Sequence, residues 1–347
     1  MRPLCHLNLA PAYRGGERQA ELLVRELARR GRPQRLVVRR GSPLAERCSD
    51  VEGLEIREVA ANPVAAGLAI RGSALSHSHE GRTIYSCLLA NILFGIPYVY
   101  TRRIVKAHGK SRLRNLAYGR ASGLVAVSRA AAQQLQEANP ARDAIVIPDA
   151  YAELPIDAEE VRGIRARYEG KVLIGHVGAL DHSHKGQMTI IEVARIAADR
   201  HPNWQFLLCG DGRDEDWFRE EIGALTNIEI VGWVDNVGDY LAAFDLFAFP
   251  SLHEALGSTV LDAMHLGLPV IATNVGGIPD FVEDGANGRL IEPEKPEQLL
   301  AGIEELLADE AELALIGERN IEKSELYDAT HMADAYETLY REIEAQV

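Results

Sequence analysis

The sequence predicts an α/β protein with two successive doubly wound parallel sheets, and three observations support this prediction. The chain has 347 residues, a length that suits about two domains. Short apolar runs alternate with helical patterns, as in parallel sheets whose strands are connected by helices. The alternation stops once, over residues 148–157 (P-D-A-Y-A-E-L-P-I-D), where two prolines and no clear period indicate a linker.

The first domain is expected over residues 1–150. Residues 17–30 carry apolar side chains at helical spacing, and this predicted helix ends at Gly31. Seven apolar runs are expected to form its strands: 3–10, 35–40, 54–60, 74–79, 97–102, 123–128 and 144–148.

The second domain is expected over residues 151–327, with six strands at 172–178, 204–210, 228–232, 245–251, 268–273 and 288–293. A last helix is expected over about 328–347. Its apolar stripe must be buried, either against its own domain or against the first one. The stripe consists of Met332, Ala335, Tyr336, Leu339, Tyr340 and Ile343.

The composition is that of a globular protein, with 47% hydrophobic and 25% charged residues. No apolar stretch approaches the roughly 18–20 residues of a membrane span, and the N-terminal segment lacks the pattern of a signal peptide. The four cysteines are scattered and form no C-x-x-C pair. This pattern predicts reduced thiols in a cytoplasmic protein and no structural zinc site.

The charge is unevenly distributed along the chain. Residues 1–150 hold 23 Lys/Arg against 12 Asp/Glu, a net charge of +11, whereas residues 151–347 hold 14 against 39, a net charge of −25. Such an asymmetry suggests that the first half faces an anionic partner. Much of the acid follows residue 300, where it fits the solvated faces of amphipathic helices.

Ligands of open parallel sheets bind beyond the carboxyl ends of the strands. In the first half, R-G-G-E-R-Q (14–19) follows the first strand and opens a helix. Gly15 and Gly16 would let an anion approach the free N–H groups there, although a plain tight turn would show the same pattern.

Two further loops of the first half carry candidate side chains. His77 and His79 lie on one face at the end of a strand, which fits acceptor binding or strand capping, and no third metal ligand is indicated nearby. Arg102 and Arg103 end the next strand, where they suit a phosphate or are solvated charges.

Two loops of the second half could bind a diphosphate. Lys185 lies in G-H-V-G-A-L-D-H-S-H-K-G (175–186), and Arg213 lies in C-G-D-G-R (209–213). The histidines that precede Lys185 fit hydrogen bonding better than metal binding.

The stretch H-E-A-L-G-S-T-V-L-D (253–262) places two acids around a helix start. Ser258 is the expected N-cap, and the N–H groups around 256–260 would face an anion. Asp262 falls one turn into an apolar helix, where it is tolerated if it accepts hydrogen bonds from paired hydroxyls such as a ribose diol. An outward-facing acid is the alternative. Glu254 lies in the preceding loop.

Residues 253–293 strongly resemble the signature of family-4 retaining glycosyltransferases of the GT-B fold, which reads Glu, seven residues, Glu, then A-M-A-x-G-x-P-V-V-A-T and G-G-x-x-E-x-V-x-D-G-x-N-G. R-G-G-E-R-Q, A-V-S-R (126–129), V-I-P-D-A (146–150) and H-K-G (184–186) match in order. A looser likeness, carried by L-N-L-A, H-S-H-E-G-R and P-Y-V-Y-T-R-R, is to members of lipopolysaccharide-core synthesis.

The resemblance implies two facing Rossmann-like domains with a cleft between them, and a last helix that returns to the first domain. The second domain would bind the nucleotide sugar and the first mainly the acceptor. Glu254 would lie near the donor sugar, Lys185 would neutralise the diphosphate, and Asp262 would contact the ribose. N–H groups of Leu256, Gly257 and Ser258 would assist Lys185, and Gly15 and Gly16 would approach the phosphates.

The sequence departs from the family pattern at four places. Asp262 replaces the usual Glu and is one methylene shorter. Gly178-Ala179-Leu180 lacks the usual Arg, for which Arg213 is the expected substitute. Thr101-Arg102-Arg103 replaces T-x-H, and Asp149-Ala150 replaces Asn-Gly.

The expected function is a retaining, metal-independent transfer of a sugar from a UDP-, GDP- or ADP-linked donor to an anionic or lipid-linked glycan, as in lipopolysaccharide-core or cell-envelope synthesis. No cofactor, metal or nucleic acid is expected. The expected place is the cytoplasm, with peripheral contact between the basic first half and an anionic membrane. The alternative is a catalytically degenerate GT-B protein that binds a nucleotide sugar or a partner without transfer.

Overall fold

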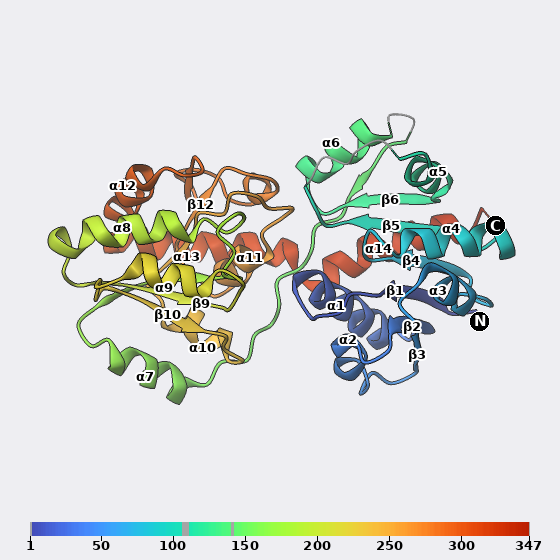
Figure 1. Ribbon diagram of the computed structural model, residues 1–347, viewed down its shortest axis with the longest axis horizontal. Helices are drawn as coiled ribbons and strands as arrows, with labels where there is room; N and C mark the ends of the chain where they lie inside the picture. The colour runs from blue at the N-terminus through green and yellow to red at the C-terminus, as the bar shows by residue number, and fades with distance from the viewer. Residues whose placement is uncertain (1, 106–110, 140–141, 347) are drawn as a thin grey trace. The chain divides into compact units, whose positions relative to one another are not determined.

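The computed structural model describes residues 2–105, 111–139 and 142–346. The chain divides into two compact units, one formed by Met1–Ala150 with Tyr327–Val347 and the other by Tyr151–Leu326 (Figure 1). They are called unit 1 and unit 2. Each of the thirteen predicted apolar runs overlaps one strand, and both sheets are parallel, so the predicted fold class is confirmed.

Unit 1 is built on a seven-stranded sheet of order β3-β2-β1-β4-β5-β6-β7. Its strands are β1 Leu4–Asn8, β2 Gln34–Arg39, β3 Leu54–Val59, β4 Leu75–Ser78, β5 Tyr98–Arg102, β6 Gly123–Ala126 and β7 Ile145–Val146. Its helices are α1 Gly15–Arg29, α2 Pro43–Arg47, α3 Pro63–Ala69, α4 Ile84–Phe94, α5 Arg112–Arg120, α6 Arg129–Ala138 and α14 Ala329–Glu344.

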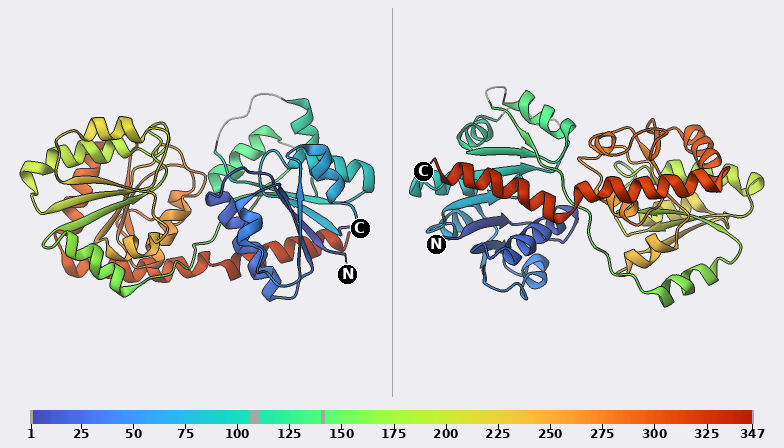
Figure 2. Two further views of the ribbon diagram at one scale, coloured as in Figure 1. Left: turned by 60° about the horizontal axis from the view of Figure 1, so that its bottom comes forward. Right: turned by 180° about the vertical axis from the view of Figure 1, so that it is seen from behind.

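Helix α14 packs against α1 and covers one face of the unit 1 sheet (Figure 2). The predicted apolar stripe is buried there with Leu4, Val99 and Val125, except that Ala333 takes the place expected for Ala335, which is exposed. The fit is also electrostatic, because Arg30 pairs with Asp334 at 2.6 Å and Arg32 pairs with Glu344. Part of the positive charge of the first half is therefore matched inside unit 1.

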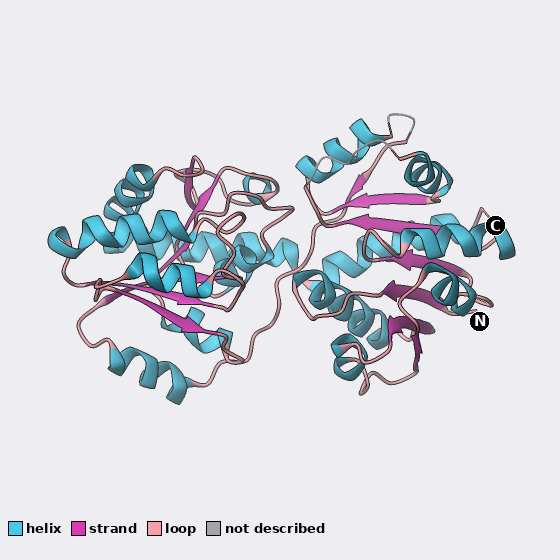
Figure 3. Cartoon of the chain, viewed as in Figure 1, coloured by secondary structure: helices cyan, strands magenta, loops and turns pink. Residues whose placement is uncertain are grey.

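Unit 2 is built on a six-stranded sheet of order β10-β9-β8-β11-β12-β13, flanked by helices (Figure 3). Its strands are β8 Val172–Val177, β9 Trp204–Cys209, β10 Ile228–Gly232, β11 Leu246–Phe249, β12 Val270–Thr273 and β13 Gly288–Ile291. Its helices are α7 Ala158–Arg167, α8 Gln187–Arg200, α9 Glu215–Ile222, α10 Val237–Ala243, α11 Ser258–His265, α12 Pro296–Leu307 and α13 Glu310–Ser324, with short 3₁₀ turns at Ile278–Asp280 and Glu325–Tyr327.

All four cysteines are buried free thiols. Burial raises the pKa of Cys48 and of Cys209 to about 12, so these two stay protonated at neutral pH. Within the described residues, no helix is long and apolar enough to cross a bilayer.

Candidate functional site

In unit 2 the chain reverses its direction of sheet growth between β8 and β11, and the loops that follow these two strands meet at that point. The backbone N–H of Leu252 donates to the His184 carbonyl at 2.7 Å, and the Ser251 hydroxyl donates to the same carbonyl at 2.9 Å. Gly186 permits this approach, because it has a φ of +65° and a Cβ there would collide with the Pro250 carbonyl. Such a switch point is the usual ligand site of an open parallel sheet.

The two loops bring Lys185 and Glu254 into contact. Lys185 Nζ lies 2.5 Å from Glu254 Oε1, and the side chains are 25% and 12% exposed. The Ser251 hydroxyl also lies 2.8 Å from the same carboxylate oxygen. These two predicted site residues therefore form an ion pair and neutralise each other.

The N-terminus of α11 adjoins this pair. The helix begins at Ser258, and its N-cap is Gly257 with a φ of +93°, so the expected N-cap at Ser258 is displaced by one residue. The first-turn N–H groups of a helix lack intrahelical acceptors and carry the positive end of the helix dipole. Gly276 lies against Glu254, and a Cβ at Gly276 would collide with the Glu254 carbonyl.

Asp262 is 2% exposed on α11, so the alternative of an outward-facing acid is wrong. Its Oδ1 accepts a hydrogen bond of 2.8 Å from the backbone N–H of Ala152, at the start of unit 2. The carboxylate thus already anchors the incoming chain. Its contact with a ribose stays a prediction.

Arg213 is exposed and is tied to the loop that carries Lys185. Its guanidinium donates to Asp181 at 2.9 Å and to the Ser183 hydroxyl at 3.0 Å. Burial alone would raise the pKa of Asp181, but hydrogen bonds from Ser183, His184 and Arg213 outweigh it and lower this pKa. Arg213 is therefore held beside the loop that carries Lys185, although it makes no direct contact with Lys185 in the described structure.

In unit 1, Gly15 and Gly16 form the first turn of α1. Neither has a positive φ, and a Cβ at Gly15 would meet no atom within 4 Å, so the backbone itself does not require glycine there. A Cβ at Gly16 would lie 3.8 Å from Cδ of Arg103. The two glycines and Arg103 therefore lie close together.

Arg103 is partly buried, with its side chain 9% exposed, and is paired with Asp149, with Nε donating to Oδ1 at 2.8 Å, so its interpretation as a solvated charge is wrong. The two residues depart from the family pattern, and in the structure they pair with each other. The buried Nη2 of Arg103 has no hydrogen-bond partner among the described residues. A buried donor without a partner is costly, so this nitrogen retains the capacity to donate to a further acceptor.

His77 and His79 are buried and lie close to His6, a third histidine that the sequence pattern does not indicate. His77 bonds to the Tyr340 hydroxyl at 2.6 Å and to the Thr101 hydroxyl at 2.7 Å. The fully buried His77 and the nearly buried His79 cannot present their rings to an acceptor in this state, so the structure favours their role within the sheet. Arg102 is also buried, 3.4 Å from the Tyr118 hydroxyl, and is not a solvated charge.

The three histidines place their nitrogens within 4.8 Å of one another, a spacing that could hold a metal ion. These nitrogens are already used. His6 Nε2 faces Gln34 Oε1 at 2.9 Å, and His6 Nδ1 faces His79 Nε2 at 2.9 Å. Because the Gln34 amide nitrogen donates elsewhere, its oxygen is an acceptor, which makes His6 Nε2 the protonated nitrogen and leaves Nδ1 to accept from His79. His6 and His79 are thus hydrogen-bonded to each other, while both ring nitrogens of His77 bond to Tyr340 and Thr101.

Comparison with known proteins shows a family match within unit 2. Residues 171–309 match the family model described as "Glycosyl transferases group 1", a stretch that contains Lys185, Arg213, Glu254 and Asp262. The lipopolysaccharide core biosynthesis glycosyltransferase LpsE of Rhizobium meliloti is 33% identical over 141 residues, which cover 40% of each chain. The sulfoquinovosyl transferase SQD2 of Arabidopsis thaliana is 33% identical over 46% of this chain and 31% of its own length. The chain thus spans less than half of the length of these relatives.

Solved structures resemble the chain over nearly its whole length. HepE of Anabaena, in complex with UDP and glucose, has a TM-score of 0.86 at 20% identity and covers 98% of this chain and all of its own. The lipopolysaccharide outer core galactosyltransferase WaaB has a TM-score of 0.73 at 12% identity, with 99% of both chains covered. The chain therefore carries a group 1 glycosyltransferase domain over residues 171–309 and has the GT-B fold.

Proposed function

We propose that the protein is a glycosyltransferase that moves a sugar from a nucleotide-diphosphate donor to an anionic or lipid-linked glycan, with retention of configuration and without a metal ion. The observation that carries the proposal is the Lys185–Glu254 pair at the switch point of unit 2, within the segment that matches the family. HepE was solved with UDP-glucose, which supports a UDP-linked sugar as the first donor to test.

The chemistry follows from the charges at this point. Cleavage of the bond between sugar and phosphate leaves negative charge on the departing diphosphate. Lys185 and the N–H groups at Leu256, Gly257 and Ser258 can stabilise that charge, and Arg213 can add to it from the neighbouring loop. Glu254, released from Lys185, is then free to accept hydrogen bonds from hydroxyls of the donor sugar.

Three further assignments complete the proposed donor site. Asp262 holds the ribose, and Gly15 and Gly16 approach the phosphates. The orphan Nη2 of Arg103 beside Gly16 supports a phosphate contact at the start of α1. For the acceptor, the likeness to LpsE and WaaB supports a lipopolysaccharide-core or cell-envelope glycan, handled in the cytoplasm at the membrane surface.

The test is a panel of UDP-, GDP- and ADP-linked sugars, with thermal stability and release of the nucleoside diphosphate measured for each. A donor that binds the folded state raises the unfolding temperature. Lys185→Ala and Glu254→Ala should each lower the rate of release about 10²–10³-fold, the usual cost of removing one group that stabilises developing charge. The unfolding temperatures without donor should stay near the wild-type value.

Lys171→Ala is the matched control, because Lys171 lies just before the opposite end of β8 and donates only to the Pro202 carbonyl in the described structure. A wild-type protein that binds a donor without releasing diphosphate would support the degenerate, non-catalytic alternative. A near-wild-type rate in either site variant would remove the site assignment.

A further inference from the structure

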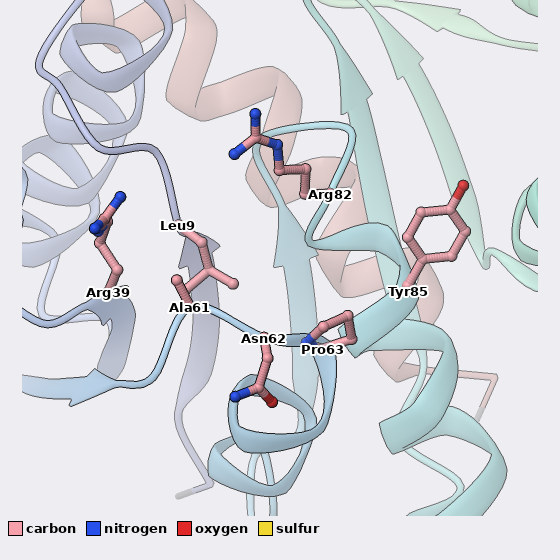
Figure 4. A pocket seen from close by; sticks show the side chains of 7 residues that line it. All are labelled: Leu9, Arg39, Ala61, Asn62, Pro63, Arg82 and Tyr85. Carbon is pink, nitrogen blue, oxygen red and sulfur yellow. The ribbon is translucent and has the colours of Figure 1, made fainter.

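A pocket of about 250 Å³ lies at the carboxyl ends of four adjacent strands of unit 1. Leu9 follows β1, Arg39 ends β2, Ala61 follows β3, and Arg82 and Tyr85 follow β4 (Figure 4). The direction of sheet growth reverses between β1 and β4, so this is the switch point of unit 1. None of the predicted acceptor residues lines this pocket.

The pocket combines an apolar floor with two cations. Leu9, Ala61 and Pro63 supply apolar surface, and Tyr85 supplies an aromatic ring whose hydroxyl points the same way as both guanidinium groups (Figure 4). Among the described residues, Arg39 and Arg82 have no carboxylate within ion-pair distance. Two arginines beside one small pocket repel each other unless an anion lies between them.

The nearest acid on the same loop is already engaged. Glu80 accepts a hydrogen bond of 2.8 Å from the backbone N–H of Leu9 and does not pair with Arg82. Burial raises the pKa of Glu80, and the positive charge of Arg82 acts against this shift without an ion pair between the two side chains. The positive charge of the pocket is therefore available to a ligand.

We propose that this pocket binds one sugar unit of the acceptor that carries an acidic group, a phosphate or a carboxylate, held by Arg39 and Arg82 with its ring against Tyr85. The volume is slightly below the roughly 300–1,000 Å³ of typical small-molecule sites, which suits a single sugar better than a nucleotide sugar. Arginine forks bind phosphate and carboxylate with paired hydrogen bonds. The inference rests on the proposed transferase function, because it assigns the acceptor side of that reaction.

The experiment measures affinities of the full chain for glucose 6-phosphate, glucuronate, glucose and inorganic phosphate by calorimetry or ligand-observed NMR. At least one acidic sugar should bind about tenfold or more tightly than glucose, and Arg39→Gln with Arg82→Gln should remove that advantage. Arg40→Gln is the matched control, because Arg40 is the exposed neighbour of Arg39 and does not line the pocket. Comparison of glucose 6-phosphate with glucuronate shows whether the site prefers a phosphate or a carboxylate.

An acidic sugar that binds no better than glucose, or that binds the double variant as well as the wild type, would overturn the proposal. Inorganic phosphate that binds as tightly as the sugar phosphate would also overturn it, because the sugar ring would then contribute nothing. Nucleotide-sugar binding is followed in the same variants and should not change. A wild-type protein that binds acidic sugars but no nucleotide sugar would contradict the proposed transferase function and leave the pocket intact.

Discussion

At the scale of single residues, the buried histidines make the stability of unit 1 sensitive to acid. Burial lowers the pKa of His6 to about 3, while Gln34 acts to raise it and Arg32 to lower it. Burial also holds the pKa values of His77 and His79 well below the usual range, and neighbouring histidines and Arg103 lower them further. Above pH 6.5 both the folded and the unfolded chain leave His6 neutral. Between pH 6.5 and about 3 only the unfolded chain gains the proton, so the free energy of unfolding falls over that window.

His6→Gln should flatten this pH dependence. Between pH 7.5 and 4.5 the variant should lose about 2–3 kcal/mol less unfolding free energy than the wild type, from about 1.4 kcal/mol per pKa unit. Urea unfolding followed by circular dichroism at the two pH values measures the difference. The exposed His253 in unit 2 supplies the control His253→Gln, which should keep the wild-type dependence. Equal losses in His6→Gln and wild type would show that His6 does not titrate as a buried group.

The buried histidines also show which contacts the sequence alone does not predict. Lys185 and Glu254 were predictable, because each stands in a recognisable loop after a strand. His6 was not, because its contact with His79 depends on parallel pairing of β1 with β4, which sets His6 opposite His77. Nothing near His6 in the chain indicates this register. The Arg103–Asp149 and Asp262–Ala152 contacts were hidden for the same reason, since they join residues 46 and 110 positions apart.

At the scale of elements, glycines with a positive φ allow the loops around Lys185 and Glu254 to approach neighbouring backbone closely. The strand runs and the helix α1 were predictable from periodicity, although α1 begins at Gly15 and not at the predicted residue 17. The collisions that require Gly186 and Gly276 appear only when neighbouring loops are assembled. Gly276 has a φ of +56° and lies against the Glu254 carbonyl. A side chain there would strain its own backbone and also displace the segment that carries Glu254.

Gly276→Ala should therefore lower the release of nucleoside diphosphate about tenfold or more and cost about 1–2 kcal/mol of unfolding free energy. Gly285→Ala is the control, because Gly285 also has a positive φ of +75° but its added Cβ would meet only the end of the Arg289 side chain. Kinetics and denaturant unfolding on both variants separate the two effects. Equal activity in the two variants would show that the position of Glu254 does not depend on Gly276.

At the scale of the whole molecule, the charge asymmetry is smaller than the sequence suggests. The returning segment 327–347 brings five acids and one arginine to unit 1, so the net charge of that unit falls from +11 to +7. Unit 1 keeps a net positive charge and also exposes apolar side chains on α3, α4 and α5. Helix α4 contacts both α3 and α5. These side chains are Val64, Leu68, Ile92, Leu93, Leu113 and Leu116, each between 47% and 58% exposed. This combination supports peripheral membrane contact through unit 1.

Wild-type protein should bind vesicles that contain anionic phosphatidylglycerol, and added salt should weaken this binding because surface charge interactions are screened. Replacing Leu113 and Leu116 by Ser should weaken binding about tenfold, as less apolar surface is transferred to the membrane. Leu315→Ser with Ile321→Ser, on α13 of unit 2, is the matched control. Vesicle sedimentation measures the binding of all three proteins. Binding that changes neither with added salt nor with the substitution of Leu113 and Leu116 would contradict membrane contact through unit 1.

The contact between Lys185 and Glu254 affects which anions can bind at Lys185. A lone lysine in this loop would collect any passing phosphate or chloride, but here the internal carboxylate already serves as its counter-ion. An anion that displaces Glu254 from Lys185 removes the ion pair of this carboxylate, whose side chain is 12% exposed in the pair, and an unpaired carboxylate in such a position is costly. A ligand that supplies both a diphosphate for Lys185 and sugar hydroxyls for Glu254 gives each of the two side chains a new partner. If Lys185 and Glu254 bind the donor as proposed, their ion pair favours the intact nucleotide sugar over either of its halves.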